Sequence, residues 1–566
     1  MADFDAIVVG SGMSGGWAAK ELSERGLKVL VIERGNEIVP ERDYKDLTPP
    51  WERPNLNRVP EDEAEKDYAI QSKGATYAFG EITKQYWVKD SDHPYENAEG
   101  ADFEWLRGYH TAGRSIMWSR LSWRLGPNDF EANAKDGHGV DWPVRYEDIA
   151  PWYEHAEKFA GVVGQKEGIP HLPDGVFQPP FEMTPAEKHL REKVQEAFPT
   201  RNVIHGRAAH LTDPTDEQLE LGRGQCQVRN QCHEGCSFKA YFSSLHATLP
   251  AAERTGNCTI VHDKIVHSVE YDEETKRVTA VNTIDQNTNE KKRFTAKIIF
   301  LNASTVGSTM ILLQSKSDAF PTGLANRSDQ VGRNLMDHVS GAYASGTLDM
   351  FHDVKTYGRR PTGIYVPPFA NTTEFDKPHL RGYGYQGYST PVIDRRAALK
   401  GIGQEFKDRN KDKPTPWNVG LYAFGEVLPY PDNRVTQHPT KKDKWGLPLA
   451  QFHGGMRENE IAILKEARKE AIKMLEVAGC KDIVAPEIDP TRLGNRIHEM
   501  GTARMGRDPS TSVLNGWNQA HDIDNLFITD GSFMTSSAAQ NPSLTYMAFS
   551  ARAANYAADL FEQGKL

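Results

Sequence analysis

The sequence is poor in cysteine, lacks long apolar runs and has no excess of basic residues, and each shortage excludes a class of protein. Five cysteines are too few, and too odd in number, for a disulfide framework. No apolar stretch reaches the ~18 residues of a membrane-spanning helix, and the mean hydropathy is −0.62. Lys and Arg number 67 against 78 Asp and Glu, so general binding of nucleic acid or of a membrane surface is not expected. We therefore expect neither a nucleic-acid partner nor a direct membrane span.

The rest of the composition is that of a large globular enzyme. A chain of 566 residues is too long for one small module and fits two large domains. Its 47 glycines, 33 prolines and 10 % aromatic residues do not indicate disorder or low complexity. The opening MADFDAIVVG has two acidic residues before its apolar run and no basic region, which predicts a buried strand and not a signal peptide.

A glycine-rich turn joins the first predicted strand, residues 5–9, to a helical pattern that ends at Gly26. Residues 10–15, GSGMSG, fit the dinucleotide fingerprint G-x-G-x-x-G. Its glycines permit a tight turn, close approach of a pyrophosphate and packing of helix on strand, and the helix N-terminus favours the pyrophosphate charge. A second predicted strand, Lys28–Glu33, ends in a carboxylate about 20 residues on, where a ribose ligand belongs.

The alternative is a plain strand–turn–helix unit with Glu33 on the surface. The fingerprint does not choose between NAD and FAD, but its N-terminal position and a later strand meander favour FAD. The residues predicted to hold FAD here are Gly10, Gly12, Ser14, Gly15, Glu33 and Arg34.

The later part of the chain predicts two further kinds of sheet. Val266–Tyr271, Val278–Ile284 and Arg293–Leu301 form a three-stranded meander of the type that interrupts the doubly wound sheet of many flavin-binding domains. Between about 340 and 455, short alternating runs such as residues 381–388, RGYGYQGY, predict strands of a separate antiparallel sheet.

A helix is predicted over residues 459–478, with Asn459 as its N-cap and Gly479 as its stop. Its apolar stripe consists of Ile461, Leu464, Ala471 and Leu475.

These patterns predict an α/β fold, α+β overall, with a Rossmann-like FAD-binding domain that contains the meander and an antiparallel-sheet substrate domain. The FAD-binding domain is assigned to residues 1–45, 100–160, 200–335 and 480–566, and it includes the loop 226–236. The substrate domain is assigned to residues 161–199 and 336–479, and residues 46–99 to a surface excursion.

Specific motifs lie at both ends and in the centre of the chain. The closing segments read HEMGTARMG at 498–506, NLFITDGS at 525–532 and AQNPSLT at 539–545. The others are GRSIMW at 113–118, DWPV at 141–144, NASTVG at 302–307 and VGRNLMDH at 331–338. Together they resemble the glucose-methanol-choline (GMC) oxidoreductases, which are FAD enzymes that oxidise alcohols.

The resemblance implies that His498 is the catalytic base and Asn541 its partner. It also implies FAD contacts for Gly113, Ser115, Trp118, Val266, Asp530, Gly531, Asn541 and Pro542, with Val266 at the adenine. The chemistry suits these residue types, because oxidising a carbinol removes a hydride from carbon, which FAD accepts, and a proton from oxygen. Neutral imidazole, with a pKa near ~6.5, can accept that proton. The alternative for His498 is a structural histidine.

Three of the five cysteines, Cys226, Cys232 and Cys236, fall within eleven residues. Thiolates on such a compact loop can bind a soft metal centre. The spacing resembles the loop of FAD sugar dehydrogenases that holds a [3Fe–4S] cluster. The alternatives are a zinc site with His233 as fourth ligand and reduced structural cysteines. Cys258 and Cys480 are predicted to be small core residues.

A cluster would make the enzyme a dehydrogenase, since iron–sulfur centres pass electrons singly to a carrier such as cytochrome c. The residue pattern of 229–244 resembles that of glucoside 3-dehydrogenases, which oxidise the C3 hydroxyl of pyranosides. Gluconate 2-, glucose 1- and fructose 5-dehydrogenases stay open, as do an oxygen-using alcohol oxidase and an electron-relay flavoprotein. Aromatic residues that could stack on a sugar, or merely pack, are Tyr383, Tyr385, Tyr388, Trp417 and Tyr422.

The resemblance also implies partners and a compartment. Related dehydrogenases carry a small chaperone-like subunit that bears the export signal. We therefore expect a periplasmic protein exported with that partner, or otherwise a cytoplasmic one.

Overall fold

The computed structural model describes residues 2–74, 77–339, 341–354, 362–392, 401–409, 415–489 and 493–566. Its first sheet has the strand order β19-β20-β10-β1-β2-β7. The bounds are β1 Phe4–Val9, β2 Val29–Ile32, β7 Cys258–Val261, β10 Lys291–Leu301, β19 Gln519–Ala520 and β20 Ile523–Ile528. All pairs along it are parallel except β19 with β20. Strands β1 and β2 are apolar and buried because parallel sheets are covered on both faces.

Helices cover one face of this sheet. They are α1 (Met13–Glu24), α9 (Thr248–Arg254) and α13 (Ser543–Glu562). Small residues such as Ala18 and Ala554 share one buried cluster with Val8 and Val31 of the strands. Ile7 and Leu30 point the other way, into the larger cluster that also includes residues of α10 (Thr305–Gln314).

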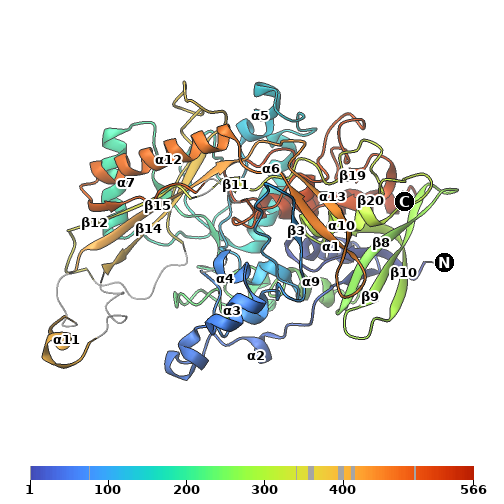
Figure 1. Ribbon diagram of the computed structural model, residues 1–566, viewed down its shortest axis with the longest axis horizontal. Coiled ribbons are helices and arrows are strands. Elements are labelled where there is room, and N and C mark those ends of the chain that lie inside the picture. The colour runs from blue at the N-terminus through green and yellow to red at the C-terminus, as the bar shows by residue number, and fades with distance from the viewer. Residues whose placement is uncertain are drawn as a thin grey trace.

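The predicted meander is confirmed as β8 (Lys264–Asp272), β9 (Arg277–Asp285) and β10, which are antiparallel to one another. Strand β10 pairs with β9 through residues 291–295 and with β1 through residues 296–301. One long strand therefore belongs to both the meander and the doubly wound sheet, and it ties them together at the end of the molecule near both termini (Figure 1).

The second sheet is antiparallel, as predicted, and lies at the opposite end of the molecule (Figure 1). Its order is β18-β12-β15-β14-β13-β5, with β11 paired to β15. The bounds are β5 Ile204–His205, β11 His338–Val339, β12 Tyr343–Leu348, β13 Ile364–Val366, β14 Tyr383–Pro391, β15 Trp417–Glu426 and β18 Lys481–Val484. Strands β5 and β18 come from ranges that the sequence assigned to the FAD-binding domain.

The long helix α12 (Glu458–Val477) packs on β15 and β12. Its end is as predicted, since Gly479 follows in the left-handed conformation with φ +76°. Its predicted N-cap is wrong, because Arg457 is the N-cap and the Glu460 carboxylate accepts a hydrogen bond from its backbone N–H. The Asn459 side chain instead accepts from the backbone N–H of Leu380.

The remaining elements complete the fold. Helix α2 (Pro40–Asp43) precedes the excursion, which contains α3 (Glu61–Asp67), α4 (Gln71–Gly74) and β3 (Glu96–Asn97). Strand β3 forms a three-stranded sheet with β16 (Arg434–Lys442) and β17 (Pro448–His453). The elements elsewhere are α5 (Pro127–Asp136), α6 (Tyr146–Ala160), α7 (Pro185–Ala197), α8 (Asp216–Glu220), α11 (Gly403–Arg409), β4 (Val162–Val163) and β6 (Ala208–Ala209). The 3-10 turns are η1 (Pro50–Glu52), η2 (Pro54–Asn57), η3 (Lys84–Tyr86), η4 (Gly113–Ile116) and η6 (Gly531–Phe533).

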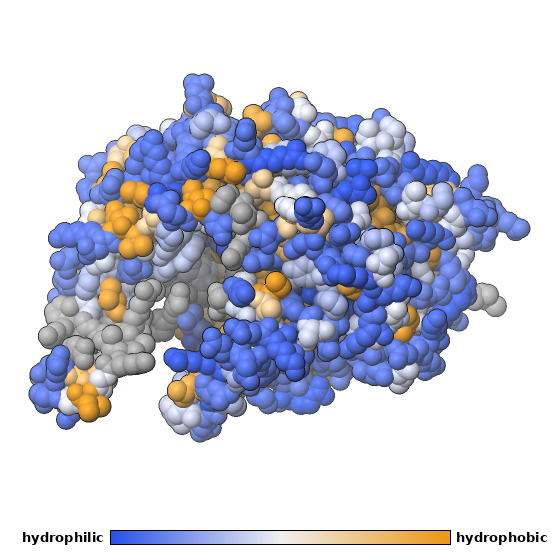
Figure 2. Space-filling view, viewed as in Figure 1, coloured by the Kyte–Doolittle hydropathy of each residue, from blue (hydrophilic) through white to orange (hydrophobic). Residues whose placement is uncertain are grey.

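The excursion shares a separate hydrophobic cluster with the segment that follows it. Tyr86 and Trp87 are buried in this cluster with Leu106, Ile116 and Met117, so this part of the excursion packs onto η4. On the face shown in Figure 2 the surface is mostly hydrophilic and its apolar residues lie in small groups. None of the helices in the described part of the chain is both long and apolar enough for a bilayer crossing.

Candidate active site

A cavity of about 790 Å³ is lined by residues of both main sheets. Most of the site residues predicted from the sequence line it. They are Gly10, Gly12, Ser14, Glu33, Arg34, Gly113, Ser115, Trp118, Val266, His498, Asp530, Gly531 and Asn541. Gly15 and Pro542 are absent from this lining: Gly15 packs α1 against the turn, and Pro542 is the N-cap residue of α13.

The glycine turn is built as the fingerprint requires. Gly10 has φ +98°, a conformation that L side chains rarely adopt. A Cβ at Gly15 would overlap the carbonyl oxygen of Gly10, so only glycine lets α1 start this close to β1. Gly12 differs, because a Cβ there would approach nothing nearer than the Ala112 carbonyl oxygen at 3.9 Å. Gly12 therefore opens onto the cavity, where the first N–H groups of α1 favour an anion.

The carboxylate of Glu33 is fixed at the end of β2. Its Oε2 accepts hydrogen bonds from the Ser11 backbone N–H at 3.1 Å and the Ser11 hydroxyl at 2.5 Å. Its Oε1 accepts from the backbone N–H of Gly35 at 3.0 Å. These bonds hold the carboxylate beside the turn, where a ribose hydroxyl of a dinucleotide would lie.

Three buried polar atoms of cavity-lining residues have no hydrogen-bond partner among the described residues. They are Nε of Arg107, the side-chain oxygen of Asn302 and the hydroxyl of Tyr546. Buried polar groups are nearly always paired, so these atoms fit a polar ligand in the cavity, as FAD would be. The sequence did not single out any of the three side chains, although Asn302 opens one of the recognised motifs.

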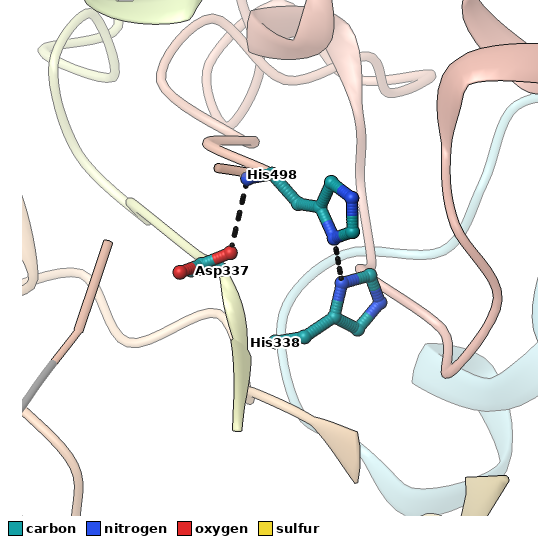
Figure 3. A group of neighbouring side chains, drawn as sticks. All are labelled: Asp337, His338 and His498. Atoms are coloured by element: carbon teal, nitrogen blue, oxygen red, sulfur yellow. Dashed lines mark hydrogen bonds between the residues drawn. The ribbon is translucent and has the colours of Figure 1, made fainter. Parts of the chain in front are cut away.

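His498 is held by backbone and ring contacts. Its backbone N–H donates to Asp337 Oδ1 at 3.1 Å, and that of Arg496 donates to Oδ2 at 3.1 Å. Its Nδ1 lies 2.8 Å from Nδ1 of His338 (Figure 3). On the other side, Nε2 lies 3.4 Å from the side-chain nitrogen of Asn541. The structure therefore brings together the two residues of the predicted catalytic pair, and it adds His338, which the sequence analysis did not single out.

The electrostatics keep this histidine neutral. Burial is the largest cause that lowers the pKa of His498 well below its usual value of 6.5, and His338, Arg114 and Arg496 add to the shift. Burial likewise lowers the pKa of His338 to about 4. Arg114 is itself paired, since its guanidinium donates to both carboxylate oxygens of Glu499 at 3.0 and 2.7 Å. At neutral pH the His498 ring is therefore unprotonated and able to accept a proton.

Ligand atoms of Asp337, His338 and His498 lie within 4.8 Å of one another, a spacing that a metal ion could use. The hydrogen bonds argue otherwise. The two ring nitrogens face each other across a shared proton, and the carboxylate accepts two backbone N–H groups. The lone pairs do not converge on a common point, so this group positions a base.

The three clustered cysteines surround a hollow of about 20 Å³, and all three are free thiols. Their loop is strained, because Val228 and Asn230 have φ values of +52° and +57°. Such strain persists where surrounding contacts impose it and is typical of functional sites.

The excursion holds this loop in place. The guanidinium of Arg53 donates to both carboxylate oxygens of Glu234 at 2.7 and 2.8 Å. The carboxylate of Asp46 accepts from Arg229 at 2.5 Å and from the Ser237 hydroxyl at 2.6 Å.

The donor set fits an iron–sulfur cluster better than a single ion. Around one tetrahedral zinc, thiolate sulfurs would lie about 4 Å apart, yet the three cysteines do not form a group with ligand atoms within 4.8 Å of one another. Nδ1 of His233 faces the Met117 carbonyl at 3.1 Å and Arg120 at 3.2 Å, so that nitrogen is turned away from the loop. In a cluster each thiolate has its own iron, and the sulfurs are spread accordingly.

The cysteine loop lies against the cavity wall. Met117, whose carbonyl faces His233, lines the cavity, and so does Tyr77, whose ring packs edge-on against His233 at 4.9 Å between centroids. His233, which lies between Cys232 and Cys236 in the sequence, therefore contacts two residues of the cavity wall.

Of the aromatic residues considered for sugar stacking, Tyr383, Tyr385 and Trp417 are buried and pack in the core. Tyr422 is 39 % exposed and lines the cavity. Tyr388 is partly buried behind it, with ring centroids 5.8 Å apart. The Tyr422 ring stacks on Tyr343 with centroids 4.2 Å apart.

Comparison with known proteins places the chain in a family. Two family models described as GMC oxidoreductase match residues 99–340 and 429–550, together more than half of the chain. A model of an NAD(P)-binding Rossmann-like domain matches residues 8–39. The chain belongs to the GMC oxidoreductase family, whose members act on CH–OH groups, and its Rossmann-like dinucleotide-binding domain supports FAD as the cofactor.

Relatives align along the whole chain. The chain is 28 % identical to the fructose dehydrogenase large subunit of Gluconobacter japonicus, with 99 % of this chain and 98 % of that protein covered. It is 27 % identical to 2-methyl-1,2-propanediol dehydrogenase of Mycolicibacterium austroafricanum, with 98 % and 94 % covered. The crystal structure of pyridoxine 4-oxidase from Mesorbium loti has a TM-score of 0.55 at 17 % identity over 98 % of both chains, which shows a shared fold.

We predict that Gly12→Val abolishes FAD binding without unfolding the protein. The added side chain would occupy the cavity where a pyrophosphate approaches, yet a Cβ there overlaps no described atom. Flavin absorbance of the purified variant and its circular dichroism measure the two effects separately. The matched variant Gly15→Val should misfold, because its Cβ overlaps the Gly10 carbonyl. A Gly12→Val protein with full FAD content would contradict the assignment.

Proposed function

We propose that this chain is the catalytic subunit of an FAD-dependent sugar dehydrogenase that passes electrons through a [3Fe–4S] cluster to an external acceptor. The observation that supports this most is the position of the cysteine loop against the wall of the cavity that holds His498 and Asn541. The substrate hydroxyl is a secondary one, and the C3 hydroxyl of a glucoside is our first choice. Gluconate 2-, glucose 1- and fructose 5-oxidation are the alternatives within the same class.

In the reaction, bound FAD supplies the hydride acceptor. The chain supplies a base and a frame: Nε2 of His498 accepts the proton of the substrate hydroxyl, and the amide of Asn541 holds the same oxygen. Gln386 donates to the side-chain oxygen of Asn541 at 2.6 Å, which directs the amide NH2 toward His498 and the cavity. The low pKa of His498 keeps the imidazole in its base form at neutral pH.

A second candidate is an alcohol oxidase that reduces oxygen. It is favoured by relatives named as oxidases, which align along nearly the whole chain. The cysteine loop argues for the dehydrogenase, because an enzyme that gives its electrons to oxygen has no need of a relay. A flavoprotein that only relays electrons is disfavoured by the His498–Asn541 pair. Measuring whether turnover consumes oxygen or needs an added acceptor separates the three.

For the partners, we propose a cytochrome c or similar carrier and a small chaperone-like subunit that takes the chain to the periplasm. Support for the subunit is the name of a relative, which is itself a large subunit. Support for carrier docking is an exposed apolar group beside the cysteine loop, in which Trp51 is 77 % and Leu47 66 % exposed. The Arg53–Glu234 pair ties this segment to the loop.

Replacing His498 with Ala should slow reduction of the flavin by substrate about 10²–10⁴-fold, the range that a general base contributes. Flavin and iron content should be unchanged. Stopped-flow reduction with D-glucose, D-fructose, gluconate and methyl glucosides measures the rate and identifies the substrate. Near-wild-type reduction in this variant would place the base elsewhere.

Replacing Cys232 with Ser should remove iron and sulfide, which the native protein should contain in about a three-to-four ratio. Oxygen is a poor substitute for a thiolate ligand. Sugar should still reduce the flavin, whereas electron transfer to a cytochrome should fail. Cys258→Ser is the control and should keep its iron. Zinc in the native protein, or unchanged cytochrome reduction without the cluster, would refute the relay.

Replacing Tyr422 with Ala should raise KM for the sugar several-fold and leave kcat within a few-fold. The Tyr422 ring lines the cavity but is not part of the hydrogen-bond chain that holds His498 and Asn541. Tyr385→Phe is the matched control: its ring is buried and its hydroxyl donates to the Ala467 carbonyl. It should change stability and leave KM unaffected. An unchanged KM in Tyr422→Ala would exclude stacking.

A further inference from the structure

We propose that His338 is a positioning residue that fixes His498 in the tautomer with its lone pair on Nε2, the nitrogen that faces the cavity. The proposal rests on the proposed function, in which His498 is the base. It is carried by a chain of hydrogen bonds that runs from the Ala538 carbonyl through both rings to Asn541.

The first step concerns the ring of His338. Strand β11 places it opposite Glu426 of β15, and its Nε2 lies 2.8 Å from the carbonyl oxygen of Ala538. A carbonyl only accepts, so the proton of the ring is on Nε2. Burial lowers the pKa of His338 to about 4, so the ring is neutral and carries one proton. Its Nδ1 is therefore a hydrogen-bond acceptor.

The second step follows at His498. Its Nδ1 lies 2.8 Å from the acceptor Nδ1 of His338 and must donate the proton between them (Figure 3). A neutral imidazole has only one such proton. Nε2 of His498 is consequently bare, and it faces the amide NH2 of Asn541 at 3.4 Å, which is a donor.

The backbone that supplies the first acceptor is itself unusual. Ala538 has φ +55°, a conformation that non-glycine residues rarely adopt. The next residues of the same segment lead to Asn541, so one strained turn sets both ends of the hydrogen-bond chain. Such strain is typical of functional sites.

Carboxylates near the rings have other partners in the described part of the chain. Asp337 accepts from the backbone N–H groups of Arg496 and His498. Glu426 is paired with Arg381, and Glu499 with Arg114. The guanidinium groups of Arg114 and Arg496 are the charged side chains that shift the pKa of His498, and Arg496 also lowers that of His338. A neutral acceptor at Nδ1 leaves the pKa of His498 low, where a carboxylate would raise it.

The test compares three variants of the holoenzyme. His338→Leu removes the acceptor and should slow flavin reduction by the fastest sugar of the panel about 10²-fold, through the rate at saturation and not through KM. His338→Asn keeps an oxygen at the position of Nδ1 and should stay within a few-fold of the native rate. FAD content and circular dichroism identify any variant that fails to fold.

Two further readouts separate positioning from a structural role. The ¹⁵N chemical shifts of labelled His498 should show a protonated Nδ1 in the native protein and in His338→Asn, and a mixture of tautomers in His338→Leu. His338→Asp places a carboxylate at Nδ1 and should raise the pKa of His498. Because the base must be unprotonated, its rate should then fall with decreasing pH at least one unit earlier than the native rate does.

Specific results would overturn the proposal. They are a folded His338→Leu protein with native rate and tautomer, a folded His338→Asn protein as slow as His338→Leu, or a pH profile that does not move in His338→Asp. His498→Ala in the same assay separates the two claims. If it is slow while His338→Leu is fast, only the positioning role fails; if it is fast, the base assignment itself fails.

Discussion

The site depends on one buried carboxylate, that of Asp337. It accepts the backbone N–H groups of Arg496 and His498, and so it fixes the segment 496–498 against the strand that begins at the next residue, His338. Burial raises the pKa of Asp337 to about 6, and the nearby Glu499 carboxylate adds to the rise. Backbone hydrogen bonds from His338 and Arg496 oppose that shift by stabilising the charged form. Losing the carboxylate would free the base, its ring partner and the cavity wall together. Because the backbone of His498 is fixed, its ring can be oriented by the 2.8 Å contact between its Nδ1 and that of His338.

The two sheets supply different walls of the cavity. The parallel sheet brings the glycine turn and Glu33 to one wall, because the carboxyl ends of parallel strands open at the same edge. The antiparallel sheet supplies Gln386 and Tyr422, which are paired across β14 and β15 and both line the cavity. Substrate-side residues can therefore vary along these strands while the dinucleotide wall and the His498 segment stay in place.

Much of the framework could be predicted from local patterns. The β1–α1–β2 unit, the meander and the antiparallel character of the second sheet follow from glycine spacing and strand alternation, which are short-range signals. The N-cap of α12 could not, because Asn459 has a better partner in Leu380, far away in sequence. Strands β5 and β18 are short edge strands whose pairing is decided only by the assembled sheet. The role of His338 could not be predicted either, because it depends on contacts made only in the folded chain. Its partners, His498 and Ala538, lie at least 160 residues away along the chain.

The cationic surroundings of His498 bear on the order of proton and hydride transfer. Burial, His338, Arg114 and Arg496 all lower the pKa of His498, so the ring is ready to accept a proton but is a weak base. A weak base cannot fully ionise an alcohol, whose proton is far less acidic than an imidazolium. Under the proposed function, the proton therefore moves to Nε2 as the hydride leaves the carbon, when the oxygen is becoming a carbonyl and its proton is most acidic. A neutral acceptor at Nδ1 suits this timing. It fixes the ring of His498 without a negative charge, which would raise the pKa of His498 and favour its protonation before the substrate reacts.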